Sequence, residues 1–188
     1  MEKIKFGTDG WRAVIAREFT VENVAKVATA AAKWLLSKKQ NPSVVIGYDT
    51  RFAGQLFAET TACVMAANNI KVYMPAAFVT TPIVSYSVPT LNADLGVVIT
   101  ASHNPPSYNG FKLKGYYGGP LLEENIKEVE ALIPEKCPFD FDKYPFSYYV
   151  NNGLIEIIDL EELYVNRVKE VFDLELIKNS NFEFAFDA

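Results

Sequence analysis

Residues Leu95 to Thr100 read LGVVIT and lead directly into the polar loop Ala101 to Gly110, ASHNPPSYNG. The apolar residues run together without alternation, which is typical of a strand that is buried on both faces of a sheet. Such a strand delivers Ser102 to its carboxyl end, the edge of an open α/β sheet at which ligands bind. The sequence therefore predicts a ligand site around Ser102.

Helical and extended patterns alternate on both sides of this strand. Thr20 offers a hydroxyl cap to a helix whose apolar residues recur at helical spacing from Val21 to Leu35. Ser43 to Tyr48, SVVIGY, is short and rich in β-branched residues, as expected of a further strand. The alternation continues to a last amphipathic helix over Leu160 to Phe172. This pattern predicts an α/β layer fold with a largely buried sheet.

The loop after LGVVIT is expected to be stiff. Pro105 and Pro106 each fix their own φ and restrict the residue before them to extended geometry. Asn109-Gly110 is typical of a tight turn, and that turn would bring Lys112 back toward the serine. The FKLK segment that follows alternates apolar and basic residues, which predicts a half-buried strand. On their own, its two lysines are interpreted as the solvated face of this strand.

Composition restricts the class of partner. The chain has 188 residues, of which 49% are hydrophobic and 22% charged. This length suits one ordinary domain with part of a second. The formal net charge is −5, so no general attraction to nucleic acid or to an anionic membrane is expected. No segment has the roughly 18 consecutive apolar residues that span a bilayer. A phosphate site must therefore be a local cluster of cations within an acidic protein.

Other features bear on the compartment and on metal chemistry. The N-terminal MEKIKFGTDGWRA has no apolar core and no small-residue cleavage site, so no signal peptide is expected. Cys63 and Cys137 are expected to be free thiols in a reducing compartment. With one histidine, the chain has too few Cys and His ligands for a zinc site. The predicted location is the cytoplasm.

Several catalytic patterns are disfavoured. Side chains of adjacent residues in extended backbone point to opposite sides, so a direct hydrogen bond between Ser102 and His103 is not expected. The chain has no G-x-S-x-G elbow and no second histidine, which argues against a triad hydrolase. Walker and dinucleotide-binding glycine patterns are also missing. Asp140 and Asp142 in DFDK are interpreted as solvated carboxylates rather than as a metal site.

Three segments carry a family resemblance: FGTDGWRA at Phe6 to Ala13, GYDTR at Gly47 to Arg51, and TASHNPPSYNGFK at Thr100 to Lys112. The third resembles the active-site signature of the α-D-phosphohexomutase superfamily, which contains phosphoglucomutases, phosphomannomutases and phosphoglucosamine mutases. The other two resemble the N-terminal loop and the second loop of this family, in the same order and at suitable intervals. The resemblance covers essentially the whole chain. It implies a three-layer α/β sandwich with a mixed, largely buried sheet between helices.

The resemblance also implies an activity, that of an intramolecular phosphotransferase. In this family the serine matching Ser102 is carried as phosphoserine and gives its phosphoryl group to a sugar monophosphate, which forms a bound bisphosphate. The other phosphate then returns to the serine, so that hexose 1-phosphate and hexose 6-phosphate interconvert. Trp11 and the PPSYNGFK segment are more similar to the glucose and mannose members. Hexose phosphates of that type and hexose bisphosphate are therefore the expected partners.

The same resemblance assigns a role to each further site residue. Lys112 would be the general acid/base for the sugar hydroxyl, and His103 would contact the phosphoryl group or the substrate beside it. Arg12 and Arg51 would bind phosphate or substrate and orient the site, with Arg12 nearest the phosphate. Asn104 would shape the loop. A phosphoserine carries about −1.5 to −2 charges and needs cations of this kind around it.

Several parts of the family's machinery are expected to lie outside this chain. Family members have three further domains, which hold a magnesium loop of type D-G-D-x-D-R, a sugar-discriminating loop and a phosphate-binding loop. None of these motifs occurs here, and DFDK lacks the glycine, the third aspartate and the arginine of the magnesium loop. Ser102, through its phosphate, would be the one Mg²⁺ ligand that this chain supplies. The chain alone is therefore expected to be catalytically inactive.

Two other interpretations stay open. The chain could be a non-catalytic relic or binding domain of the same fold, or a phosphatase in which water attacks the phosphoserine. The presence of Ser102, His103 and Lys112 together argues against decay of the site.

The expected domain boundary lies near residue 158. Residues 1–158 would form domain 1, and residues 159–188 would be the truncated beginning of domain 2, outside the core of the first. Phe182 to Ala188, FEFAFDA, has the pattern of a buried strand with no partner after it. Such a strand favours self-association of the chain through this tail.

Overall fold

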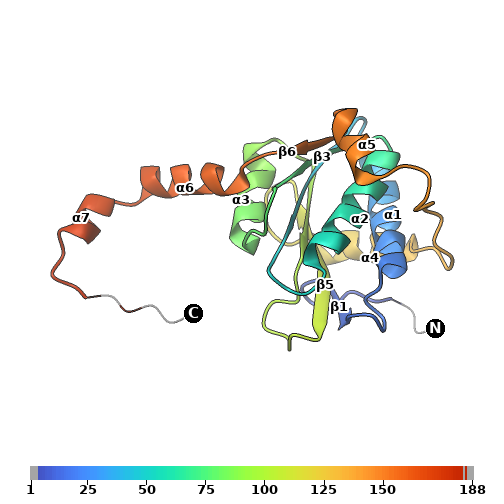
Figure 1. Cartoon of the computed structure of the whole chain (residues 1–188), viewed down its shortest axis with the longest axis horizontal. Coiled ribbons are helices and arrows are strands. Elements are labelled where there is room, and N and C mark those ends of the chain that lie inside the picture. Colours follow the sequence, from blue (N-terminus) through green and yellow to red (C-terminus); the bar gives the residue numbers. More distant parts are fainter. Residues whose placement is uncertain (1–3, 184, 186–188) are drawn as a thin grey trace.

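The computed structural model describes residues 4–183 and residue 185 (Figure 1). The strands are β1 (Trp11–Val14), β2 (Ser43–Tyr48), β3 (Lys71–Met74), β4 (Leu95–Ile99), β5 (Tyr108–Gly115) and β6 (Ile155–Ile157). The helices are α1 (Val21–Lys38), α2 (Gly54–Ala67), α3 (Thr81–Thr90), α4 (Glu123–Ala131), α5 (Phe146–Asn151), α6 (Leu160–Val171) and α7 (Leu174–Lys178).

The strands assigned in the described residues form one mixed sheet in the order β1-β5-β4-β2-β3-β6. From β4 to β6 all neighbours are parallel, whereas β5 is antiparallel to both β4 and β1. Every residue of β4 is buried, as its unbroken apolar run predicts. The loop that follows β4 therefore starts at the carboxyl edge of the parallel part of the sheet.

Helices cover both faces of this sheet (Figure 1). On one face, α1, α2, α4 and α5 enclose a core that includes Trp11 and Phe111. On the other face, α3 and the start of α6 cover a smaller cluster that includes Val98 and Leu160. The expected three-layer α/β sandwich is therefore confirmed.

Local sequence signals account for most of the element boundaries. The Thr20 hydroxyl accepts a hydrogen bond from the Asn23 backbone N–H at 3.2 Å, so α1 begins at Val21 as predicted. The bounds of β2 also agree with the predicted SVVIGY strand. The sequence does not predict helix α5, because the segment around it is rich in Pro, Tyr and Phe and shows no helical period over its six residues.

The strand β5 differs from the sequence prediction. It begins at Tyr108, so Asn109 and Gly110 pair with β1 and the predicted turn at Asn109-Gly110 is wrong. The chain reverses earlier, where the Tyr108 N–H donates to the Pro105 carbonyl at 2.9 Å. Gly110 serves close packing instead, since a Cβ there would lie 2.5 Å from the Thr100 carbonyl oxygen.

The lysines of β5 are buried as well. Lys112 and Lys114 are only 5% and 6% exposed, so the expectation of a solvated strand face is wrong. They project from the face of the sheet that carries Val98, because Val98 is the direct partner of Lys112 on β4. A pair of lysines in this position is costly unless anions compensate it.

Helix α6 leaves the body of the molecule, yet its first turns belong to the core (Figure 1). The Asp159 side chain caps this helix by accepting from the Glu162 N–H at 2.8 Å. Leu160 is fully buried, and Leu163 and Tyr164 pack partly buried against the same cluster under α3. The expectation that everything from Asp159 onward lies outside the first core therefore fails at Leu160.

Beyond these first turns the C-terminal segment exposes apolar side chains, among them Phe172 and Leu176. Of the predicted FEFAFDA strand, Phe182, Glu183 and Ala185 are described and have no strand assignment. The other four residues of that segment lie outside the described residues. Association through this tail therefore stays a prediction.

Two further expectations concern membrane spans and thiols. None of the helices in the described part of the chain has the length and apolarity that crossing a bilayer requires. Cys63 and Cys137 are free thiols, as expected, and burial raises the pKa of Cys63 to about 11.

We expect Leu160→Ala to destabilise the fold by about 2–5 kcal/mol, because it opens a cavity in the cluster under α3. Leu176→Ala is the matched control: this leucine is 70% exposed, so its truncation should change stability by less than about 0.5 kcal/mol. Urea unfolding followed by circular dichroism measures both. Equal effects of the two substitutions would show that α6 is not part of the first core.

Candidate active site

Ser102 lies on the exposed loop that begins after β4 ends at Ile99. Its backbone is left-handed, with φ of 57°, which costs about 1–2 kcal/mol for a residue with a Cβ. The Ser102 N–H donates to Thr100 Oγ1 at 3.0 Å, and this bond helps to hold the unusual conformation. The serine hydroxyl is thus presented at the carboxyl edge of the sheet, as predicted from the strand before it.

The left-handed backbone also changes the relation of Ser102 to His103. Ser102 Oγ lies 3.4 Å from His103 Nδ1, and both residues are exposed. The expectation that the two side chains point to opposite sides is therefore wrong, since it assumes extended backbone at Ser102. His103 is placed to exchange a proton with the serine hydroxyl or to contact a group attached to it.

Arg51 anchors the loop from the neighbouring strand. Its guanidinium donates to four backbone carbonyls of the loop, those of Ser102, Asn104, Pro105 and Tyr108, at 2.7 to 3.0 Å. Its Nε lies 3.5 Å from Asp49 Oδ2, and the side chain is only 14% exposed. These contacts support the predicted role of Arg51 in orienting the site. They do not support phosphate or substrate binding by Arg51, because its donors are directed at the protein.

Arg12 reaches the same loop from β1. Its Nη1 donates to Asn104 Oδ1 at 2.7 Å, and its Nη2 lies 4.0 Å from Asp9 Oδ2. Asn104 in turn donates its backbone N–H to the Ala101 carbonyl at 3.1 Å. The proposed loop-shaping residue and the proposed phosphate-binding arginine are therefore in direct contact.

Lys112 lies on the same face of the sheet as Arg12. Their neighbours Trp11 and Phe111 are cross-strand partners, and both point into the opposite core. Since side chains alternate along a strand, Arg12 and Lys112 project to the other side. Lys112 Nζ donates to Asp9 Oδ2, which places one carboxylate between the two cations.

The electrostatics of this group follow from burial and from its excess of cations. Burial tends to raise the pKa of Asp9, but the hydrogen bond from Lys112 and the charges of Lys112, Lys114 and Arg12 outweigh it and lower this pKa. The pKa of Lys114 is lowered mainly by burial and further by Lys112, against the opposing effect of Asp9. One carboxylate thus faces three cations, and the site has capacity for an additional anion.

Two contributors are not among the predicted site residues. The sequence pattern places Thr100 only at the end of the buried strand, although its hydroxyl accepts the Ser102 N–H. The sequence pattern does not single out Asp9, although its carboxylate lies 4.0 Å from Arg12 Nη2 and accepts a hydrogen bond from Lys112. Asp9 and Thr100 lie in the short triplets TDG and TAS of the two motifs. Asp and Thr side chains often bond to groups close by in the sequence, and this tendency is the signal that could have indicated both residues.

The residues around Ser102 do not by themselves form a metal site. Among residues 4–183 and 185, no three His, Cys, Asp or Glu side chains gather in a way that could hold a metal ion. Asp9 and Asp49 are engaged by Lys112 and by Arg51. The described residues therefore form a cation-rich cluster, and a metal ion there would need ligands beyond those described.

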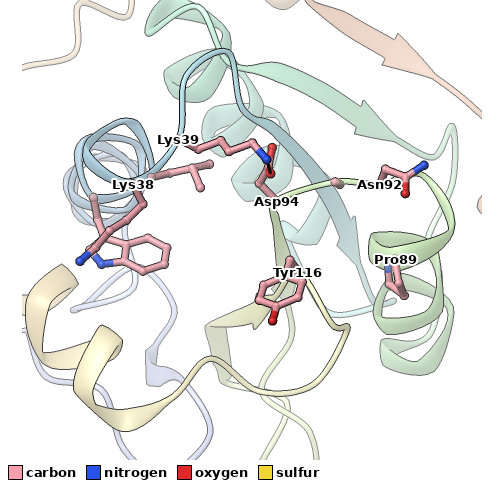
Figure 2. A pocket seen from close by; sticks show the side chains of 9 residues that line it. Lys38, Lys39, Pro89, Asn92, Asp94 and Tyr116 are labelled. Carbon is pink, nitrogen blue, oxygen red and sulfur yellow. Dashed lines mark ion pairs between the residues drawn. The ribbon is translucent and has the colours of Figure 1, made fainter.

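A cavity elsewhere has different chemistry. It has a volume of about 600 Å³ and lies at the other edge of the sheet, where Asp94 precedes β4 and Tyr116 follows β5 (Figure 2). Figure 2 shows Lys39 reaching Asp94, with an ion pair of 3.3 Å, and Lys38 pairs with Glu128 at 2.9 Å. Both cations are thus neutralised, so the sheet edge that carries Ser102 remains the better candidate for an anionic ligand.

The fold and the loop of Ser102 together define an α/β domain that presents a serine at the carboxyl edge of its sheet, and comparison with known proteins identifies the family. Residues 3–137 match the family described as phosphoglucomutase/phosphomannomutase, alpha/beta/alpha domain I. The match covers well over half of the chain, so the chain belongs to this family.

Individual relatives agree with this assignment. The chain is 34% identical to a phosphoglucomutase of Staphylococcus saprophyticus over 174 residues, which are 89% of this chain and 32% of the relative. It is 44% identical over 136 residues to a phosphoglucomutase of Staphylococcus epidermidis, which are 69% of this chain and 24% of the relative. The chain thus spans about a third or less of these relatives.

Solved structures show the same relation. A crystal structure of a Thermus thermophilus protein described as a phosphomannomutase is 37% identical, with a TM-score of 0.79 over 93% of this chain and 37% of the other. The open form of Paramecium parafusin, a phosphoglucomutase, has a TM-score of 0.77 at 20% identity over 100% of this chain and 39% of that one, which supports the fold alone.

We expect Asp9→Asn to lower stability in a pH-dependent way. The pKa of Asp9 is lowered in the folded state, so its ion pair stabilises fully above the ordinary carboxyl pKa of about 3.9 and is lost as the pH falls through the lowered value. The gap in unfolding free energy between the natural chain and Asp9→Asn should thus be largest near pH 7 and shrink below about pH 4.

Urea unfolding at pH 7 and pH 3 measures this gap. Glu123→Gln is the matched control, because Glu123 pairs with Lys127 on an exposed helix surface where ion pairs contribute little. A gap for Asp9→Asn that is unchanged between the two pH values would contradict the assigned role of Asp9.

Proposed function

We propose that this chain is the phosphoserine-bearing domain of a hexose phosphomutase, with Ser102 as the carrier of the phosphoryl group. One observation carries the proposal: the Ser102 hydroxyl is exposed at the carboxyl edge of the sheet on a loop that Arg51 and Arg12 fix. Membership of the phosphoglucomutase/phosphomannomutase family supports the reaction class. The proposed substrates are hexose phosphates of the glucose or mannose type and the corresponding bisphosphate.

In the proposed reaction a sugar hydroxyl attacks the phosphorus of phosphorylated Ser102. A bond forms between the sugar oxygen and phosphorus, the bond from Oγ to phosphorus breaks, and the serine oxygen takes up a proton. For this step Lys112 must act as the neutral amine, which accepts the proton of the attacking hydroxyl, and His103, 3.4 Å from Oγ, must be protonated to supply one to the serine. The reverse sequence with the other phosphate of the bisphosphate restores the phosphoserine.

The charges of the site suit this transfer. Phosphoryl transfer depends mostly on positioning and on neutralising charge that spreads over the phosphoryl oxygens. Arg12 contacts Asn104 of the serine loop, and Lys112 lies on the same face of the sheet as Arg12. Asp9 joins the two and keeps their side chains fixed.

Magnesium is part of the same proposal. When bound, Mg²⁺ would neutralise charge on the phosphoryl oxygens. In this chain Ser102 would contribute through its phosphate only, since no carboxylate cluster accompanies it in the described residues. The remaining ligands would come from another domain of the longer protein.

The domain boundary near residue 158 belongs to this proposal too. We place domain 1 at residues 1–158 and the beginning of domain 2 at residues 159–188, with Leu160 as an anchor on the first domain. The family match ends at residue 137, and relatives continue far beyond the length of this chain. A cytoplasmic location of the longer protein is likewise proposed.

Phosphorylation of the chain tests the carrier role. After incubation with a hexose 1,6-bisphosphate, intact-mass measurement should show a gain of about 80 Da on the natural chain and none on Ser102→Ala. Ser107→Ala, which alters an exposed serine of the same loop, should still gain this mass. Lack of any mass gain in the natural chain would favour the non-catalytic relic, whereas a gain that water rapidly removes would favour the phosphatase.

The chain alone should not interconvert hexose 1-phosphate and hexose 6-phosphate. The expected turnover is below detection in a coupled assay with Mg²⁺ present, because the metal ligands and further substrate contacts are missing from the described residues. The S. saprophyticus phosphoglucomutase serves as the positive control. Turnover by this chain comparable to that control would disprove the need for the other domains.

A further inference from the structure

The loop that carries Ser102 combines a strained backbone with several carbonyl groups that point toward one another, and a residue outside the loop compensates for both. Ser102 is left-handed, with φ of 57°, and the carbonyls of Ser102, Asn104, Pro105 and Tyr108 all turn toward one point. Four carbonyl dipoles that converge repel one another, and the strained serine would relax unless a group at that point holds them. Arg51 occupies this point.

Each of the four terminal N–H groups of the Arg51 guanidinium has one carbonyl partner in the loop. Nη1 donates to Pro105 and Tyr108, both at 3.0 Å, and Nη2 donates to Ser102 at 2.8 Å and to Asn104 at 2.7 Å. The fifth N–H, on Nε, faces Asp49 Oδ2 at 3.5 Å. A guanidinium has five N–H donors, so none is left over for a phosphate or a sugar.

Arg51 is itself fixed from the neighbouring strand. Its backbone N–H donates to Asp49 Oδ1 at 3.0 Å, and the Asp49 N–H donates to the carbonyl of Ile99 at 3.1 Å. Asp49 follows β2, which pairs in parallel with β4. The conformation of the serine loop is thus tied to the ends of two buried strands through one planar cation.

We infer that Arg51 is a positioning residue that sets the left-handed conformation of Ser102 and so the direction of its hydroxyl, rather than a residue that binds the phosphate. This revises the expectation that Arg51 contacts substrate. The kinetic part of the inference rests on the proposed phosphoryl transfer, and the structural part does not. Lysine cannot replace it, because an ammonium has three donors and no planar fork for four carbonyls.

Two variants test the inference. Arg51→Lys keeps the charge and loses the fork, and Arg51→Ala leaves a space that free guanidinium can fill at about 50 mM, a concentration too low to unfold the chain. Arg167→Lys is the matched control, because Arg167 lies on the exposed part of α6 and pairs with Glu170 at 3.1 Å. Circular dichroism and thermal unfolding establish that each variant is folded.

The first readout does not depend on phosphoryl transfer. Amide hydrogen exchange of the peptide covering residues 100–109 should be at least about 10-fold faster in Arg51→Lys and Arg51→Ala than in the natural chain. Guanidinium should slow the exchange of Arg51→Ala again and leave Arg51→Lys unchanged. Unaltered exchange in both variants, or no response of Arg51→Ala to guanidinium, would overturn the inference.

The second readout is the rate of phosphoryl uptake from a hexose 1,6-bisphosphate, followed by intact mass. A displaced hydroxyl should slow the maximal rate by about 10- to 100-fold in both variants, with guanidinium restoring part of it in Arg51→Ala. The half-saturating bisphosphate concentration should change by less than about 3-fold, since Arg51 has no donor for the substrate. A large change in that concentration with an unchanged maximal rate would instead show that Arg51 binds substrate.

The two readouts separate this inference from the proposed function. If the natural chain takes up no phosphate while the loop still loosens in both variants, the phosphoserine role fails and the positioning role stands. If the natural chain is phosphorylated and Arg51→Lys is equally fast with an unaltered loop, the positioning role fails and the phosphoserine role stands.

Discussion

Four backbone carbonyl oxygens of one loop converge on the guanidinium of Arg51, and the geometry of the site depends on this interaction. It allows Ser102 to keep a left-handed backbone at the exposed tip of the loop. That backbone in turn brings His103 beside the hydroxyl and leaves Asn104 facing Arg12. One largely buried cation, three residues beyond the end of β2, thus holds the loop that carries Ser102, His103 and Asn104, and Arg12 of β1 contacts the same loop.

The chain is acidic as a whole, yet it gathers cations at one place. Its net charge is −5, yet Arg12, Lys112 and Lys114 gather around the single carboxylate of Asp9. The two lysines are almost fully buried, so their charges are weakly screened by solvent. Burial of cations with incomplete compensation is unfavourable, and a bound phosphoryl group would relieve it.

Much of the fold could be predicted from the sequence because the strong periodic signals belong to buried elements. The unbroken LGVVI run and the SVVIGY strand are buried where the patterns place them. The short strand β1 and the extension of β5 escape prediction for a physical reason: they exist because they pair with each other. Asn109 and Gly110 favour a turn locally, and the cross-strand pairing with β1 overrides that preference.

The residues of the candidate site could be predicted from the sequence motifs, but most of the contacts among them could not. Family motifs brought together Ser102, Arg12, Lys112 and Arg51, whereas the conformation of one residue decided which of them could touch. An extended Ser102 would separate its hydroxyl from His103, and the observed left-handed one brings them to 3.4 Å. Such a conformation is supported by the tertiary contact from Arg51 and by the local hydrogen bond to Thr100.

The two ends of α6 have different environments. Leu160 is fully buried under α3, while the apolar side chains of Phe172 and Leu176 remain exposed. Asp159 caps the helix, and the contacts of Leu160, Leu163 and Tyr164 with the cluster under α3 hold its first residues against the sandwich. The N-terminal end of α6 is therefore packed against the sandwich, whereas the described apolar side chains beyond its C-terminal end are exposed. The packing of Leu160, Leu163 and Tyr164 against the cluster under α3 thus ties the start of α6 to the sheet that carries the serine loop.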